Sequence, residues 1–138
     1  MVNLTPFPKR FNRGNIEISA QPEYLNSRIN GGNITFAWSY HIKITNISKR
    51  TFQLTKRHWQ IIDVNGGIEN VSGDGVVGTN PILKPNDSFE YSSAVNLNCP
   101  SGVMMGHYDM ADENGVAIKV KIPSFSLDVP DNKSVVVH

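Results

Sequence analysis

Apolar and polar residues alternate along most of this chain, and a period of two residues is typical of a β-strand with one buried face. The longest alternating run covers residues 33–45. One face of this run carries Phe36, Trp38, Tyr40, Ile42 and Ile44, and the other carries Thr35, Ser39, His41, Lys43 and Thr45. The run therefore predicts a long strand with one face in the core and one face in water.

Shorter runs predict further strands in the first half of the chain. Residues 16–18 begin one strand, residues 52–54 mark a short one, and residues 58–64 form another. The last run is apolar at both phases of the alternation, which predicts a strand covered on both faces. Its Trp59 is expected in the core, because large aromatic side chains dominate core burial. Asn65-Gly66 then predicts a turn into the next strand.

The second half of the chain repeats the pattern. Residues 89–97 alternate, and residues 103–110 and 116–122 flank a segment whose Asn-Gly pair predicts a hairpin. Residues 125–129 supply a last run. No segment shows the i, i+3, i+4 spacing of a helix, and Gly and Pro interrupt every candidate. The chain therefore predicts an all-β sandwich, with a closed barrel holding a ligand in its mouth as the alternative.

Composition limits the classes of protein and partner. The chain has 138 residues, which predicts one domain, and its net charge of +1 argues against a nucleic-acid partner or a membrane surface. A single Cys excludes a disulfide framework and a zinc ribbon. The beginning of the chain has no apolar signal region, and no apolar run is long enough to span a bilayer, so a cytoplasmic location is expected.

The alternating part of the chain sets the expected domain bounds. We expect an N-terminal arm over residues 1–14, one domain over residues 15–130 and a tail over residues 131–138. The tail contains Ser134-Val135-Val136-Val137, which is apolar and β-prone. It can add a strand to a sheet edge, in the same chain or in a second copy that forms a homo-oligomer, and a frayed terminus is the equal alternative.

Gly73, Gly75 and Gly78 match the spacing G-x-G-x-x-G of dinucleotide-binding loops. That motif works by opening a helix, and Pro81 and Pro85 leave no room for one. The glycines therefore predict a tight turn or a bulge that needs positive φ angles.

The same glycine loop can bind an anion in another way, through bare backbone N–H groups. In that case Arg57 and His58 are the candidates that supply positive charge to a phosphate-containing small ligand. The two residues end a basic stretch over residues 49–58, with Phe52 and Trp59 interleaved. Such a stretch can bind single-stranded nucleic acid, but the near-neutral total charge favours a solvated strand edge.

Candidates for catalysis and metal binding are few. His107 and Asp109 lie two residues apart, so they share one face of a strand and can supply half of a metal site, although surface polar residues are the favoured interpretation. Without a third ligand we predict no metal site and no cofactor. Cys99 has no base placed beside it, and no Gly-x-Ser-x-Gly elbow occurs. We therefore predict no catalytic residues and no enzyme activity.

Four stretches of the chain resemble the ApaG family of small bacterial proteins. They are RHWQIIDVNG (57–66), VSGDGVVGTNPILKPNDSFEYSS (71–93), SGVMMGHYDM (101–110) and IPSFSLDVP (122–130). The resemblance implies an immunoglobulin- or fibronectin type III-like β-sandwich of about seven or more antiparallel strands. It also implies association with cobalt resistance and magnesium efflux. Related eukaryotic domains look like protein-binding modules, and the family's glycine motif has been suggested as a pyrophosphate site.

These observations lead to one expected function and two alternatives. We expect a non-enzymatic module that binds a protein partner through a sheet face or edge. The first alternative is a phosphate or nucleotide ligand at the Gly73–Gly78 loop. The second alternative, a divalent-metal-responsive protein, rests on the family association and on His107 and Asp109.

Overall fold

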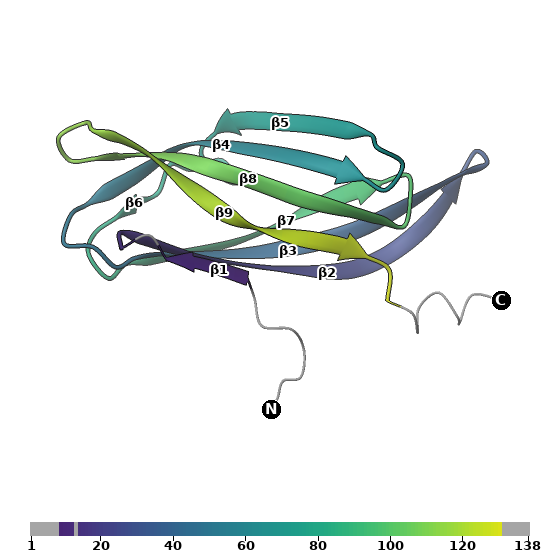
Figure 1. Cartoon of the computed structure of the whole chain (residues 1–138), viewed down its shortest axis with the longest axis horizontal. Helices are drawn as coiled ribbons and strands as arrows, with labels where there is room; N and C mark the ends of the chain where they lie inside the picture. Colours follow the sequence, from purple (N-terminus) through teal and green to yellow (C-terminus); the bar gives the residue numbers. More distant parts are fainter. Residues whose placement is uncertain (1–8, 13, 131–138) are drawn as a thin grey trace, which may run out of the picture.

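Two antiparallel sheets pack face to face in the computed structural model, which describes residues 9–12 and 14–130 (Figure 1). The first sheet has the strand order β1-β2-β3-β7, and the second has the order β5-β4-β8-β9 with β6 also paired to β4. The strands are β1 (Lys9–Asn12), β2 (Ile16–Asn30), β3 (Asn33–Asn46), β4 (Phe52–Asp63), β5 (Ile68–Asp74), β6 (Ile82–Leu83), β7 (Ser88–Leu97), β8 (Ser101–Asp112) and β9 (Ala117–Asp128). The predicted β-sandwich is confirmed.

The core lies between the inner faces of the two sheets. β3 contributes the alternating residues that the sequence predicts, and Trp38, Ile42 and Ile44 are fully buried there. The second sheet contributes Phe52 and Tyr108, so large apolar side chains of both layers interdigitate. No helix long and apolar enough to cross a membrane occurs in the part of the chain that the structure describes.

Two strands are longer than the sequence predicts. Residues 52–63 form one strand, because Thr55 is a bulge between the Leu54 and Lys56 pairs with β8 and shifts the alternation by one residue. Similarly, β9 continues past Pro123, where its register with β8 shifts. The prediction that residues 58–64 are covered on both faces is wrong. Trp59 is buried, but His58 lies only half-buried on the outer face.

The structure describes part of the expected N-terminal arm and none of the expected C-terminal tail. Of the predicted N-terminal arm, residues 9–12 form β1, which pairs with residues 17–20 of β2. Residues 131–138, the predicted tail, lie outside the described residues, so its strand pairing stays a prediction.

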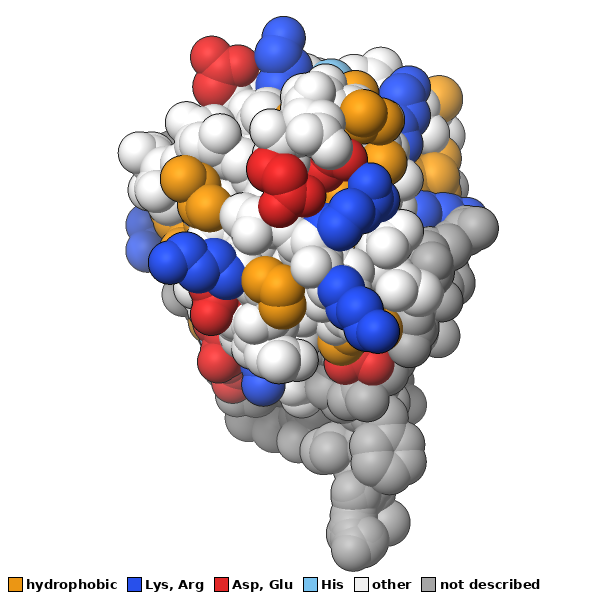
Figure 2. Space-filling view, turned by 90° about the vertical axis from the view of Figure 1, so that its left-hand side faces the viewer, with side chains coloured by type: hydrophobic (Ala, Val, Ile, Leu, Met, Phe, Trp, Pro, Cys, Tyr) orange, Lys and Arg blue, Asp and Glu red, His pale blue; other side chains and the backbone are white. Residues whose placement is uncertain are grey.

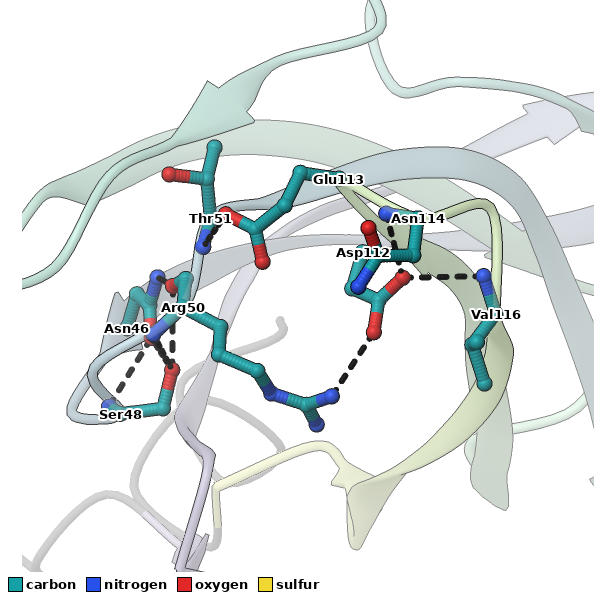
Figure 3. A network of polar contacts seen from close by, with 8 residues as sticks. All are labelled: Asn46, Ser48, Arg50, Thr51, Asp112, Glu113, Asn114 and Val116. Carbon is teal, nitrogen blue, oxygen red and sulfur yellow. Dashed lines mark hydrogen bonds and ion pairs between the residues drawn. The ribbon is translucent and has the colours of Figure 1, made fainter.

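A polar network ties the β3–β4 connection to the β8–β9 turn (Figure 3). The Arg50 Nη1 donates to Asp112 Oδ2 at 2.7 Å. The other oxygen of this buried carboxylate accepts the backbone N–H groups of Asn114 and Val116, each at 2.9 Å. On the other side, the Asn46 side chain donates to the carbonyl of Arg50 at 2.7 Å. The buried polar groups of both turns are thereby paired.

Candidate functional site

The glycine loop is a tight turn between β5 and β6, with no helix following it in the described chain. Gly75 and Gly78 have φ angles of +61° and +80°, which explains why glycine stands at both positions. Val76 and Thr79 exchange two backbone hydrogen bonds, at 2.8 and 2.9 Å, and the Gly75 N–H donates to the Thr55 carbonyl at 2.9 Å. Three N–H groups of the loop therefore already donate to carbonyl oxygens.

Arg57 lies against this loop on the inner side of β4. Its Nη1 donates to the carbonyls of Asp74 and Gly75, at 3.0 and 3.1 Å. A Cβ at Gly73 would come within 2.8 Å of the Arg57 guanidinium, so glycine at this position leaves the space that Arg57 occupies. The guanidinium thus binds loop carbonyls, and the structure brings together Arg57, Gly73 and Gly75.

His58 is not part of this group. Neighbouring residues of a strand point to opposite faces, so His58 lies on the outer face of the sheet. There its Nδ1 is 2.9 Å from Ser72 Oγ, and its Nε2 is 2.8 Å from Asp109 Oδ2. Arg57 and His58 therefore do not converge on one pocket.

The order Ser72–His58–Asp109 resembles a nucleophile, a base and an orienting carboxylate. Acyl transfer by such residues also needs oxyanion donors and a bound substrate beside the nucleophile, whereas Ser72 is exposed on an edge strand. His41 on β3 has the same kind of partners, Ser92 Oγ at 2.9 Å and Glu90 Oε1 at 2.7 Å. Because both sheets carry this arrangement, we interpret it as cross-strand hydrogen bonding on solvated faces.

A second imidazole distinguishes the His58 group. His107 lies directly opposite His58 in the β4–β8 pairing, and the two rings stack with centroids 4.5 Å apart. Its Nε2 is 3.6 Å from Asp109 Oδ1. One ligand atom from each of His58, His107 and Asp109 lies within 4.8 Å of the other two. The structure thus joins the predicted half-site, His107 and Asp109, to a third residue.

Burial and neighbouring groups shift the pKa values of His107 and Asp109 in this cluster. Burial lowers the pKa of His107, and the neighbouring His58 lowers it further. The hydrogen bond from His58 lowers the pKa of Asp109. At neutral pH the cluster therefore presents a neutral His107 and an ionised Asp109. Sequence reasoning missed His58 as a member, because its place opposite His107 depends on the register of strands about 50 residues apart.

Comparisons with known proteins agree on one family. The family model of the ApaG domain matches residues 26–112. A protein named ApaG from Methylocella silvestris is 50% identical over 115 residues, which is 83% of this chain and 88% of that protein. One from Paramagnetospirillum magneticum is 46% identical over 118 residues, 86% of this chain and 91% of that protein. A crystal structure of a Bordetella pertussis protein described as ApaA has a TM-score of 0.79 and 32% identity, covering 91% of this chain and 99% of that one.

Proposed function

Since the chain belongs to the ApaG domain family, we propose that it is a non-enzymatic module that binds a partner protein. The partner segment is extended and apolar, and it binds the hairpin arm, which we define as residues 24–36 at the joined ends of β2 and β3 (Figure 1). The proposal rests on the arm's inner face, because that face is apolar where the sandwich no longer covers it.

The arm projects beyond its own sheet. The last pair between β3 and β7 is Phe36 with Leu97, so residues 33–35 of β3 pair only with β2 among the described strands. Ile29 and Ile34 are directly opposite each other in this two-stranded part. They share the face of Phe36 and Trp38, which continues inward as the core.

The exposed apolar surface of these two isoleucines can be buried against a partner, which would stabilise the complex. Ile29 is 80% exposed and Ile34 is 45% exposed. Burying an isoleucine side chain fully is worth about 1.5–3 kcal/mol, so the exposed parts of this pair can supply about 2–4 of the roughly 8 kcal/mol of a micromolar interaction. The backbone edge of residues 33–35 can add strand pairing in the position where β7 ends, and this favours an extended occupant.

The end of the sandwich opposite the hairpin arm has a mixed charged and apolar surface. Lys, Arg, Asp and Glu side chains alternate there with small groups of apolar ones (Figure 2). Val116, in the β8–β9 turn at this end, is 55% exposed. Scattered apolar residues of this kind are normal on a protein surface. Val116 is therefore a matched control for the arm.

A phosphate ligand at the Gly73–Gly78 loop ranks behind partner binding. Anion binding needs free N–H groups, and those of Gly75, Val76 and Thr79 donate to carbonyls. Arg57 likewise donates to two carbonyls of the loop. We therefore rank this alternative second.

Photo-crosslinking in cells tests the proposal with the full chain. A photoreactive phenylalanine replaces Ile29 in one variant and Val116 in the other. We expect a partner protein crosslinked from position 29 and absent from position 116. Titration of the purified partner by calorimetry should then show affinity lowered about tenfold or more by Ile29→Asp or Ile34→Asp, and unchanged by Val116→Asp.

Several outcomes would contradict the proposal. Crosslinks from position 29 only to residues 131–138 of the same chain would identify the predicted tail as the occupant. Crosslinks only to a second copy would identify a homo-oligomer. Equal loss of partner affinity in the Val116→Asp variant would show that the arm is not the contact surface.

A further inference from the structure

Three metal-ligand groups from β4 and β8 meet on the outer face of the second sheet, whereas the proposed partner site is on β2 and β3 of the first sheet. We propose that His58, His107 and Asp109 form a binding site for a divalent transition-metal ion of the Zn²⁺ and Ni²⁺ class. The ligand atoms would be one ring nitrogen from each histidine and one carboxylate oxygen, which lie within 4.8 Å of one another. This proposal does not depend on partner binding.

The backbone places all three side chains without help from a loop. His58 and His107 are a directly opposed pair of β4 and β8, and Asp109 follows two residues along the same face. Sites built on strands are held more precisely than sites on loops.

Side-chain rotation has to bring the three ligand atoms to the spacing that a metal ion requires. Tetrahedral zinc, with bonds of about 2.0–2.1 Å, needs ligand atoms about 3.3 Å apart. The distance from Asp109 Oδ2 to His58 Nε2 is 2.8 Å, and from Asp109 Oδ1 to His107 Nε2 it is 3.6 Å. The two distances go to different oxygens of the carboxylate, so binding through one oxygen needs rotation of the Asp109 side chain and of the stacked rings. The ion would replace the hydrogen bond between His58 and Asp109.

The donor set selects the class of metal. Two imidazole nitrogens and one carboxylate oxygen suit zinc and nickel, whereas magnesium and calcium prefer oxygen ligands. Three protein ligands leave a position for water or an external ligand. All three side chains are about one-third exposed, so an ion can reach them from solvent.

A neighbouring group orients one of the ligands. The Ser72 Oγ lies 2.9 Å from His58 Nδ1 and can accept a hydrogen bond from Nδ1–H when an ion replaces the proton on Nε2. This arrangement is that of a histidine that binds metal through one nitrogen.

Charges on β9 oppose the binding of a cation. Lys119 is directly opposite Asp109 in the β8–β9 register, so its positive charge lies beside the proposed site. Lys121 is opposite His107. We therefore expect a dissociation constant in the micromolar range, and tighter binding in the Lys119→Gln variant.

The chain provides a matched control in His41. Its Nδ1 and Nε2 have a serine and a carboxylate as partners at 2.9 and 2.7 Å, as His58 has, and it belongs to no group of three ligands among the described residues. The fourth histidine, His138, lies outside the described residues. Variants of His41 and His138 therefore report metal binding unrelated to the proposed site.

Calorimetry of the untagged full chain with zinc chloride or nickel chloride tests the site. We expect one ion per chain, with affinity reduced about tenfold or more by His58→Gln or by His107→Gln, and unchanged by His41→Gln or His138→Gln. An excess of magnesium chloride should not displace the ion. Resonances of the His58 and His107 rings should shift in the NMR spectrum on addition of zinc, which is independent of stability.

Three results would overturn the proposal. They are the absence of binding below about 1 mM, binding that His107→Gln leaves unchanged, and equal loss of binding in the His41→Gln control. Urea unfolding of each variant separates loss of the site from loss of the fold.

Discussion

His58 and His107 stack across the β4–β8 pairing with their ring planes 24° apart, and both face the carboxylate of Asp109. Two bases so close together cannot both become cations without repulsion. The carboxylate compensates for one charge but also keeps the two rings near each other. Acid should therefore weaken the contact between β4 and β8 at this pair.

The first prediction concerns stability at acidic pH. The pKa of His107 in the fold lies below its ordinary value of 6.5, so folding favours the neutral ring. The free energy of unfolding should then fall as the pH drops below about 6.5 and through the lowered pKa. Asp109, whose pKa lies below 3.8, adds a second loss at still lower pH, as the carboxylate is protonated.

The loss of stability caused by protonation of His107 is measured by urea unfolding of the wild type and of His107→Gln. The measurement is repeated at several pH values between about 7.5 and 4.5. The groups that face His107 from neighbouring strands are His58, Asp109, Lys119 and Lys121. The difference between the two proteins should shrink as the pH falls, because only the wild type protonates this ring. A difference that stays constant with pH would contradict the prediction.

Strand faces could be predicted from the sequence where the alternation is uninterrupted. In β3 every predicted core residue is on the inner face, because no bulge shifts the phase over residues 33–46. In β4 the extra Thr55 breaks the phase, so one strand looks like two. Ile62 is only half-buried on the outer face of the sheet, so its apolar character wrongly suggested a second covering layer.

The candidate site shows a second limit of prediction from the sequence. His107 and Asp109 could be placed on one face because they are neighbours in sequence, two residues apart. The position of His58 depends on which residue of β8 it meets, and the bulge at Thr55 decides that register. Gly75 and Gly78 could be predicted as turn residues, whereas Gly73 lies in β5 without a positive φ angle. The contact of Arg57 with the carbonyls of Asp74 and Gly75 depends on the pairing of β4 with β5, which the sequence does not show.

The second prediction compares two glycines of the same loop. A Cβ at Gly75 would lie 2.1 Å from the Thr79 carbonyl oxygen, whereas one at Gly78 meets no atom within 4 Å. Both have positive φ angles, so Gly78→Ala should cost about 1–2 kcal/mol through backbone strain alone. Gly75→Ala should cost at least twice as much, since the turn must also open.

Thermal and urea unfolding of both variants measure these costs. Equal destabilisation would show that the loop adapts to the added methyl group. If Gly75→Ala retains wild-type stability and loses binding of pyrophosphate, then the loop is a ligand site and the partner-binding proposal loses its first rank.

The third prediction concerns the ion pair of the β8–β9 turn. The Asp112 side chain is 1% exposed and accepts hydrogen bonds from Arg50, Asn114 and Val116 (Figure 3). Removing one partner of a buried ion pair costs about 3–5 kcal/mol, because the remaining groups lose their partner. Asp112→Ala should fall near the lower end, since Arg50 is half-exposed and can turn to water.

Glu113 is the control for this prediction. Its carboxylate accepts one exposed backbone N–H, from Thr51 at 3.1 Å, so Glu113→Ala should remain close to the wild type. The two variants are compared by urea unfolding. Similar stabilities of Asp112→Ala and Glu113→Ala would show that the buried network adds little.

The fourth prediction compares two buried tryptophans. Trp38 Nε1 donates to the Asp128 carbonyl at 2.9 Å, whereas the buried Trp59 Nε1 has no partner among the described residues. Replacement of either by phenylalanine removes a similar volume. Trp38→Phe also leaves a carbonyl unpaired, so it should destabilise the fold by about 1 kcal/mol more than Trp59→Phe.

The same hydrogen bond joins the end of β9 to the base of the hairpin arm, because Trp38 pairs with Tyr24. Trp38→Phe should therefore speed hydrogen exchange at the amides of residues 33–36 as well as lower the unfolding free energy. Trp59 packs against Tyr40 and Phe125 and makes no hydrogen bond to the end of β9, so its variant should leave exchange in the arm unchanged. Equal exchange in the two variants would show that the arm is held by strand pairing alone and not by its link to β9.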